Sequence, residues 1–216
     1  MLKLKVVTVV TVLVTLFNST TALAEEVPPT PPSNESLILK FKEIGVPLVD
    51  DSRKEFLRSL CALRELLLGY TSREDATIND KDLITAGATI NSKFINGLNV
   101  SQHCQMAYFV REQKVVKVIP VSSGAKGFES KKGEHKTSWR FNGWRESSSY
   151  PGSFLYKPVY YYKGQAVHGM RSDSLVKTYP ASHGCIRVKQ RDARFLFTAL
   201  TGNMQIKIYG DYYRSR

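Results

Sequence analysis

HGMRSDSLVKTYPASHGCIRV, residues 168–188, combines two histidine–glycine pairs with one of the few cysteines of the chain. The first pair begins at His168, and the second pair directly precedes Cys185. A catalytic cysteine needs a base or a cation beside it, because the thiolate is the nucleophile and a free thiol titrates near ~8.5. It also needs N–H donors for the oxyanion that forms at a carbonyl group, and glycine lets a substrate approach such backbone groups. This stretch therefore offers the residue types of a cysteine nucleophile, a histidine base and an oxyanion hole.

The same residues also have interpretations without catalysis. A histidine at a strand end is usually a hydrogen-bonded structural residue, and Cys185 would also suit a buried structural thiol. His168, His183 and Cys185 are all ligand types for zinc, but a structural zinc site expects a fourth ligand, and the sequence offers none at ligand spacing. From these residues alone, catalysis, structure and metal binding all stay open.

Residues 1–24 have the pattern of a secretory signal peptide. Lys3 and Lys5 precede an apolar run over 6–17, and small residues over 22–24 form a cleavage site. An uncleaved membrane anchor is the alternative, although the run is shorter than the ~20 residues that span a bilayer. Cleavage would remove two lysines and no acidic residue, so that 192 residues remain and the net charge falls from +12 to +10. We therefore expect an exported protein of the cell wall or extracytoplasmic space, anchored to the membrane if the signal is retained.

The basic composition favours an anionic partner. The chain has 31 Lys and Arg residues against 19 Asp and Glu residues, which suits a cell-wall polymer, a membrane surface or nucleic acid. It has no Cys/His finger spacing and no aromatic-basic strand signature of a nucleic-acid module, and export argues against DNA. We expect no nucleic-acid partner, and an anionic cell-wall polymer stays a candidate.

The cysteines are Cys61, Cys104 and Cys185, an odd number for an exported protein. Outside the cytoplasm thiols tend to pair, and a cysteine that is left over suggests a reactive thiol. Three pairings are open, and the sequence does not settle which of them forms. We favour Cys61–Cys104, because this pairing leaves Cys185 for chemistry. Three free thiols, or a paired Cys185, are the alternatives.

Composition and periodicity divide the rest of the chain into three parts. Residues 25–35 are rich in proline and polar residues, which is typical of an extended linker. Residues 36–92 have a helical pattern, most clearly between the cap candidates Asp-Asp-Ser (50–52) and Gly69. We predict a small helical module there. Residues 97–210 are predicted to form a mostly β domain with one clear helix.

Strands and hairpins follow from the runs of Val, Ile, Tyr and Phe in this second part. The predicted segments are a hairpin of 105–110 and 115–121, a hairpin of 158–162 and 165–167, a helix over 190–200 and a last strand over 204–209. The second hairpin turns at Lys163-Gly164 and delivers His168 at a strand end. The basic run 130–136 is expected to be a solvated loop, with polymer binding as the alternative.

The stretch 168–188 resembles the signature of the L,D-transpeptidase catalytic domain family. In that family an upstream His-Gly is followed, after a short loop, by Ser-His-Gly-Cys, an aliphatic residue and then Arg or Asn. The matching residues here are His168, Gly169, Ser182, His183, Gly184, Cys185, Ile186 and Arg187. Supporting likeness spans about 97–210, and 49–69 is similar to a weakened peptidoglycan-binding-like module. The resemblance implies an L,D-transpeptidase-type β-sandwich with one or two helices, preceded by a small helical module.

The resemblance also implies an enzyme of peptidoglycan biosynthesis and of cell shape. Cys185 would attack the amide between diaminopimelate and the terminal D-alanine of a stem tetrapeptide, release D-alanine and remain as a thioester. The side-chain amine of a neighbouring stem would then attack this thioester and form a 3→3 cross-link. With water as acceptor the enzyme would be an L,D-carboxypeptidase, and a non-catalytic wall-binding protein is the alternative from another class. We expect no cofactor and no metal ion, and we expect carbapenems to acylate Cys185.

The resemblance also implies a role for each residue of the motif. His168 would be the general base that accepts the thiol proton and passes it to the leaving amine, with its ring oriented by the carbonyl of Gly169. The N–H groups of Gly184 and Cys185 are candidates for the oxyanion hole. The pocket would be shaped by Ser182, His183 and Arg187. The guanidinium of Arg187 suits a substrate carboxylate, which it can bind through a two-donor fork.

One stretch departs from the family pattern. Where the family often has Thr-Pro-x-Gly-x-Phe before the active site, residues 133–144 keep Thr137 and Phe141 but lack the proline and the glycine. The departure concerns the local loop and not the chemistry. Tyr150 and Tyr156 are candidates for lining the substrate groove, with packing as the favoured interpretation of both.

Overall fold

The computed structural model describes residues 39, 42–43, 53–68 and 94–212. The predicted signal peptide, the predicted linker and most of the predicted helical module lie outside these residues. The helices are α2 (Arg53–Leu68), the short 3₁₀ helix η2 (Asp173–Leu175) and α4 (Gln190–Ala199). The strands are β1 (Gly97–Ser101), β2 (Met106–Arg111), β3 (Lys114–Ser122), β4 (Gly133–Lys136), β5 (Trp144–Glu146), β6 (Phe154–Tyr162), β7 (Gln165–Gly169), β8 (Ile186–Val188) and β9 (Gln205–Tyr209). Among the described residues, no helix is long and apolar enough to cross a bilayer.

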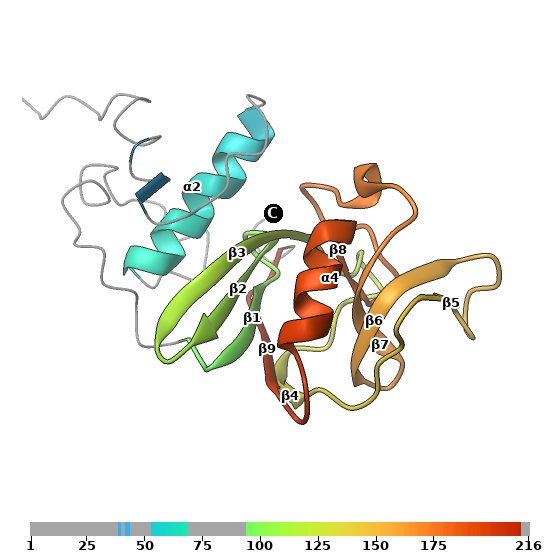
Figure 1. Ribbon diagram of the computed structural model, residues 1–216. Helices are drawn as coiled ribbons and strands as arrows, with labels where there is room; N and C mark the ends of the chain where they lie inside the picture. Colours follow the sequence, from blue (N-terminus) through green and yellow to red (C-terminus); the bar gives the residue numbers. More distant parts are fainter. Residues whose placement is uncertain (1–38, 40–41, 44–52, 69–93, 213–216) are drawn as a thin grey trace, which may run out of the picture. The chain divides into compact units, whose positions relative to one another are not determined.

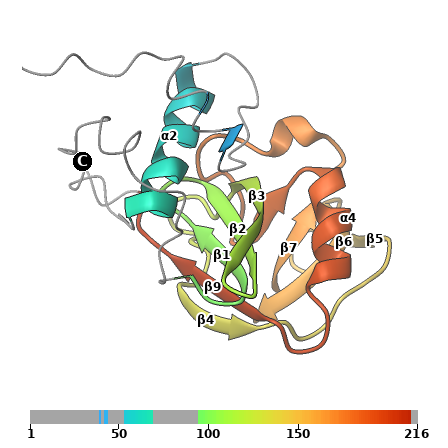
Figure 2. The same cartoon turned by 60° about the vertical axis from the view of Figure 1, so that its left-hand side comes forward.

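The strands form one nine-stranded sheet in the order β4-β9-β1-β2-β3-β8-β7-β6-β5 (Figure 1). Figure 2 shows β9, β1, β2 and β3 side by side with β4 at their edge. Most neighbours are antiparallel, but β1 with β9 and β7 with β8 are parallel pairs. The sheet curls, so that the segment after the edge strand β4 contacts β6, which lies next to the opposite edge. There Arg140 forms a bridge with Val159 of β6, and the Ser138 N–H donates to the Tyr160 carbonyl at 2.9 Å.

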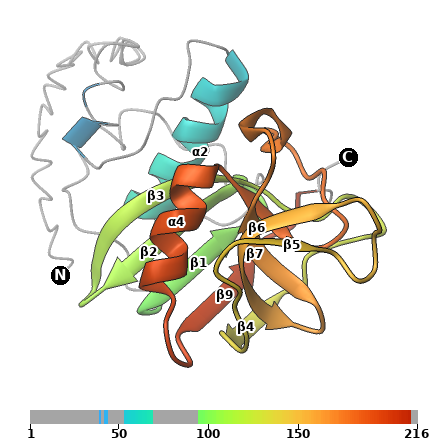
Figure 3. The same cartoon turned by 45° about the vertical axis from the view of Figure 1, so that its right-hand side comes forward.

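The main hydrophobic core lies inside this curl. Hydrophobic side chains from both halves of the sheet meet there, and α4 packs against them with Ala193, Leu196 and Ala199. Figure 3 shows helix α4 lying against the sheet. The sheet contributes Leu98, Val100, Ala107, Phe109, Ile119, Val121, Val159, Tyr161, Val167, Ile186, Val188, Ile206 and Ile208. Full burial of a Val, Leu, Ile or Phe side chain contributes about 1.5–3 kcal/mol relative to leaving it exposed. The core therefore fixes the central strands β7 and β8, which carry the motif residues.

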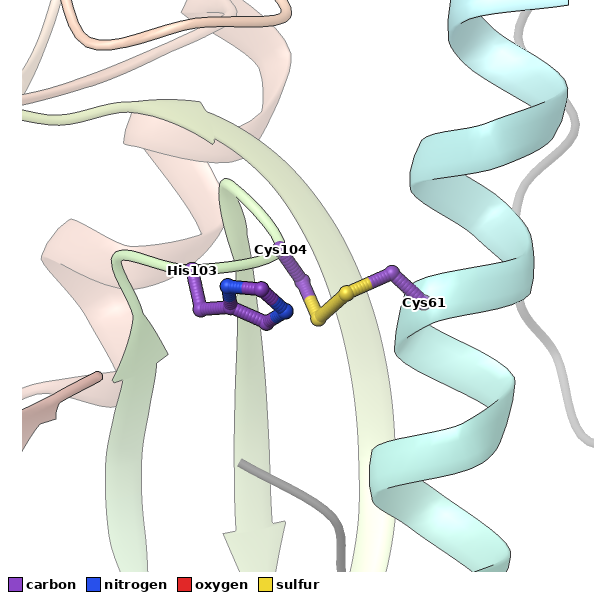
Figure 4. A group of neighbouring side chains, drawn as sticks. All are labelled: Cys61, His103 and Cys104. Carbon is purple, nitrogen blue, oxygen red and sulfur yellow. A yellow bond between two sulfur atoms is a disulfide. The ribbon is translucent and has the colours of Figure 1, made fainter. Parts of the chain in front are cut away.

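A second core joins α2 to the outer face of β2 and β3. Leu60, Ala62, Leu63 and Leu66 of the helix pack with Phe94, Met106, Tyr108, Val110 and Val118. A disulfide and a set of hydrogen bonds also join α2 to the sheet. Cys61 forms a disulfide with Cys104, which lies in the turn between β1 and β2 (Figure 4). The buried carboxylate of Glu65 accepts hydrogen bonds from three hydroxyl groups, those of Ser101, Tyr108 and Tyr209, at 2.7, 2.7 and 3.2 Å.

The prediction of a mostly β fold with helices is confirmed, whereas some element limits differ. The first hairpin loop is shorter than predicted, because Arg111 extends β2 and only Glu112 and Gln113 form the turn. Both have positive φ, 50° and 61°, as a tight hairpin requires. The solvated-loop prediction for 130–136 was wrong for Gly133–Lys136, which is strand β4. This edge strand pairs with β9 but is mostly exposed, so it lacks the alternation of apolar residues that marks a strand.

Candidate active site

The parallel pair β7–β8 places three motif residues on one face of the sheet. Val167 lies opposite Ile186 in this pair, and both side chains point into the main core. Because side chains alternate between the two faces of a strand, the next opposed pair, His168 and Arg187, points to the other face. Cys185, two residues before Arg187, shares that face. His168 and Cys185 are separated in the sequence, and the pairing of β7 with β8 brings them to the same face of the sheet.

A cavity of about 240 Å³ opens on this face of the sheet. His168, Cys185 and Arg187 all line it, as predicted pocket residues should. Its other walls include Tyr150, Tyr160, Lys163, Gln165, Ser182 and His183. The cavity thus brings the candidate nucleophile, the candidate base and a cation together, with aromatic and polar side chains around them.

His168 is held as a neutral imidazole. Only 4% of the residue is exposed, and its Nδ1 lies 2.8 Å from the carbonyl oxygen of Gly169. Because a carbonyl oxygen only accepts, Nδ1 donates this bond, and Nε2 is the unprotonated nitrogen of the neutral ring. Burial lowers the pKa of His168 to about 4, aided by the positive charge of Arg187 and opposed by the Gly169 carbonyl. At neutral pH the ring is therefore ready to accept a proton.

Cys185 is the free cysteine of the described residues. Its Sγ accepts a hydrogen bond from the backbone N–H of Ala166 at 3.4 Å. Burial raises the pKa of the Cys185 thiol, while the Ala166 N–H and the charge of Arg187 oppose this rise. The thiol is therefore protonated at neutral pH and needs a base to become a nucleophile. A neutral imidazole on the same cavity wall is such a base.

The turn before the cysteine is organised by Ser182. This residue is only 2% exposed, and its hydroxyl donates to the Cys185 carbonyl at 2.5 Å while it accepts the Gly184 N–H at 3.1 Å. Gly184 has a φ of +109°, and a Cβ there would lie 2.7 Å from Nε2 of Gln165, so the position requires glycine. The Gly184 N–H already donates to the Ser182 hydroxyl. Of the two predicted oxyanion donors, the Cys185 N–H is therefore the better candidate.

His183 and Tyr150 form an aromatic rim on the cavity. Their rings stack with centroids 4.5 Å apart and an interplanar angle of 20°. Phe128 packs edge-on against the same imidazole at 4.8 Å. Tyr150 lines the cavity, so packing alone does not describe it. Tyr156, in contrast, packs against the main core and has ring and Cβ atoms 3.2–3.3 Å from where a Gly169 side chain would begin.

One group of metal-ligand types exists in the described part of the chain, outside the cavity. It consists of Cys61, His103 and Cys104, whose ligand atoms lie within 4.8 Å of one another (Figure 4). Both sulfur atoms belong to the disulfide, and a disulfide offers no thiolate to a metal ion. The disulfide joins the two cysteines that the sequence analysis paired, and it leaves Cys185 free.

Several site residues were not anticipated from the sequence. Ala166 acts through its backbone N–H, which no residue pattern in the sequence indicates. Gln165 and Tyr161 flank the second hairpin turn, but nothing in the sequence indicates that their side chains reach Gly184. Ser130 lies in the run predicted as a solvated loop, and it is 1% exposed. The Ser130 hydroxyl donates to the carbonyl of Gly184, a contact between distant parts of the chain that the sequence does not indicate.

Comparisons with known proteins found one matching family and several solved structures of similar fold. The L,D-transpeptidase catalytic domain family matches residues 98–208, more than half of the chain. The comparison with curated proteins found no match. A solved L,D-transpeptidase structure from Xylanimonas cellulosilytica is 22% identical with a TM-score of 0.55, over 84% of this chain and 100% of that one. Another, from Stackebrandtia nassauensis, is 16% identical with a TM-score of 0.53, over 83% and 91%. At these identities the two structures show a shared fold.

Proposed function

This chain belongs to the L,D-transpeptidase catalytic domain family, and we propose that it is an exported cysteine L,D-transpeptidase that forms 3→3 cross-links in peptidoglycan. Members of this family act on peptidoglycan stem peptides. The observation that carries the proposal is the placement of the protonated thiol of Cys185 and the neutral imidazole of His168 on one cavity. This pair suits acyl transfer, because it forms the nucleophile only when the proton has an acceptor.

Acylation of the enzyme is the first step. Sγ of Cys185 attacks the carbonyl carbon of the diaminopimelate–D-alanine amide, and Nε2 of His168 takes the thiol proton. The Cys185 N–H donates to the oxyanion of the tetrahedral intermediate. When this intermediate collapses, the C–N bond breaks, the proton on His168 passes to the leaving amine, and D-alanine departs. A thioester on Cys185 remains.

Transfer to the acceptor is the second step. The side-chain amine of a neighbouring stem attacks the thioester carbon, and His168 takes the proton that this amine loses. The C–S bond then breaks, the proton returns to the sulfur, and the new amide is the 3→3 cross-link. The Gly169 carbonyl holds the imidazole in the tautomer that both steps need. The half-buried side chain of Arg187 lines the cavity, and its guanidinium would bind a stem carboxylate through a two-donor fork.

Export is part of the proposal. The predicted signal peptide lies outside the described residues, but the Cys61–Cys104 disulfide supports an oxidising compartment, where such bonds persist. Glycan binding by residues 36–92 stays a prediction, because only α2 and three residues before it are described there.

The test is turnover of disaccharide-tetrapeptides by the purified protein, followed by mass spectrometry of the products. We expect cross-linked dimers together with free D-alanine. Cys185→Ala should abolish both products, and His168→Gln should slow them by about 10²–10⁴-fold. His103→Gln is the matched control, because His103 lies beside the Cys61–Cys104 disulfide and does not line the cavity.

Two other results would change the assignment. Tripeptide products without dimers would replace the cross-linking role by an L,D-carboxypeptidase role. No turnover by the native protein, or equal turnover by Cys185→Ala, would overturn the catalytic proposal and favour a wall-binding protein.

A further inference from the structure

The carbonyl of Gly184 is anchored by a buried serine from a distant loop. The Ser130 hydroxyl donates to the Gly184 oxygen at 2.8 Å. The same hydroxyl oxygen accepts the backbone N–H of Gly124 at 3.0 Å. A serine hydroxyl has a single hydrogen, so this arrangement directs that hydrogen to Gly184. Ser130 is 1% exposed, and water therefore does not compete for the bond.

Tyr161 gives the same carbonyl a weaker second contact. Its hydroxyl lies 3.4 Å from the Gly184 oxygen and 3.1 Å from Oε1 of Gln165. The shorter distance makes Gln165 its principal acceptor. Oε1 of Gln165 also accepts the Lys131 N–H at 2.9 Å, so the amide is fixed by the loop that carries Ser130. Ser130 is therefore the principal anchor of the carbonyl, and Tyr161 supports it.

Anchoring this carbonyl also sets the direction of the next N–H group. The Gly184 C=O and the Cys185 N–H belong to one planar peptide unit, in which they point in opposite directions when the bond is trans. Glycine at 184 has the φ of +109° that only a residue without Cβ adopts readily. The same freedom would let the peptide rotate if the carbonyl lost its partner. A fixed carbonyl thus means a fixed N–H beside the nucleophilic sulfur.

We propose that Ser130 is a positioning residue for catalysis: its hydroxyl holds the Gly184–Cys185 peptide so that the Cys185 N–H receives the oxyanion. The inference rests on the proposed function. Ser182 has a different task, because it holds the Gly184 N–H and the Cys185 carbonyl. Together the two serines fix both peptide units around Gly184. Ser130 touches no substrate, and it acts through the direction of one N–H group.

The test compares two reactions of the Cys185 thiol. Acylation by imipenem forms an oxyanion, whereas alkylation by iodoacetamide occurs at a saturated carbon and forms none. Removing one oxyanion donor typically costs about 10²–10³-fold in rate. We therefore expect Ser130→Ala to acylate about 10²-fold more slowly, while its alkylation rate and the pH profile of alkylation stay near those of the native protein. Both rates are read as the intact mass of the full chain against time.

Matched variants separate positioning from folding. Ser138→Ala removes another serine hydroxyl that donates to a backbone carbonyl, that of Tyr160 at 3.2 Å, and it should leave acylation unchanged. Tyr161→Phe removes the supporting hydroxyl with little change in volume and should slow acylation less than Ser130→Ala. Tyr162→Phe is its control, because the Tyr162 hydroxyl makes no hydrogen bond among the described residues.

Three results would overturn the inference. Native-like acylation of Ser130→Ala would show that the Ser130 anchor has no role in catalysis, whatever the rate of Tyr161→Phe. An equal loss of acylation and alkylation would show a general disturbance of the turn rather than loss of an oxyanion donor. If the native protein is alkylated at Cys185 but never acylated, the proposed function fails together with the inference, which distinguishes this case from the first.

Discussion

Acylation of Cys185 should stay near its neutral-pH rate down to about pH 5, because burial lowers the pKa of His168 to about 4. Only the pH of the acylation assay is varied, and the protein is the native chain. The base works only as a neutral ring, so the acid limb of kcat/KM reports the pKa of His168 in the free enzyme. An exposed histidine would titrate near ~6.5 and would lose its function well above pH 5.

At pH 5 the neutral fraction of the His168 ring differs greatly between a buried and an exposed histidine. With a pKa of about 4, roughly 90% of the His168 rings are neutral at pH 5, whereas a pKa of ~6.5 would leave roughly 3% neutral. The assay is the second-order rate of imipenem acylation between pH 4 and 8, followed by intact mass. Circular dichroism at each pH checks that the protein stays folded. A half-maximal rate near pH 6.5 would refute the assignment of a buried, neutral His168 as the base.

The same pKa predicts how the free energy of unfolding depends on pH. The unfolded chain binds a proton at His168 near ~6.5, but the folded chain binds it only near 4, so protons favour the unfolded state between these values. Stability is fully present above pH ~6.5 and falls as the pH drops toward 4. The loss amounts to about 2.5 kcal/mol at pH 4.5. Urea titrations of the native protein and of His168→Gln should differ in this slope, and equal slopes would contradict the lowered pKa.

The other expectations concern α2 and the cysteine turn. Replacing Cys61 and Cys104 by alanine opens a loop with a sequence separation of 43 and should lower the free energy of unfolding by about 4 kcal/mol; a loss below about 1 kcal/mol in urea titrations would contradict this. Glu65→Ala leaves three buried hydroxyls without their acceptor and should cost about 2–4 kcal/mol. The exposed Glu134→Ala should cost less than about 1 kcal/mol, and similar values for both would refute the role of Glu65. Gly184→Ala should slow imipenem acylation by at least about 10-fold, because φ there is +109°, and a native rate would show that the turn tolerates a side chain.

The elements that the sequence predicts well are those with a local signal. The helix over 190–200 matches α4, and the last strand matches β9, because periodicity and a following or preceding glycine mark them. The two hairpins follow from the runs of Val, Ile, Tyr and Phe in their strands and, for the second hairpin, from the turn at Lys163-Gly164. In contrast, β1 (GLNVS) is buried on both faces and shows no alternation, and β4 is mostly exposed. β1 pairs with β2 and with the distant β9, and β4 pairs with β9. The long-range pairing with β9 leaves no local pattern in either strand.

The site divides in the same way. His168-Gly169 and His183-Gly184-Cys185 are short motifs of consecutive residues. His168 and Cys185 could therefore be proposed as site residues from the sequence alone. Ser130 could not, because only the contact between its loop and the cysteine turn gives its hydroxyl a role. Glu65 was hidden for a related reason, since a charged residue on a helix is normally solvated, whereas here three hydroxyls surround it.

The proposed activity requires that Cys185 is the nucleophile and that its thiol is free to react. Its most direct test is the intact mass of the purified protein before and after exposure to imipenem, with peptide mapping under non-reducing conditions. We expect one adduct, on the peptide that contains Cys185, and a Cys61–Cys104 bridge in the same map. An unmodified protein in which Cys185 is bound in a disulfide, or an adduct that persists in Cys185→Ala, would contradict the account.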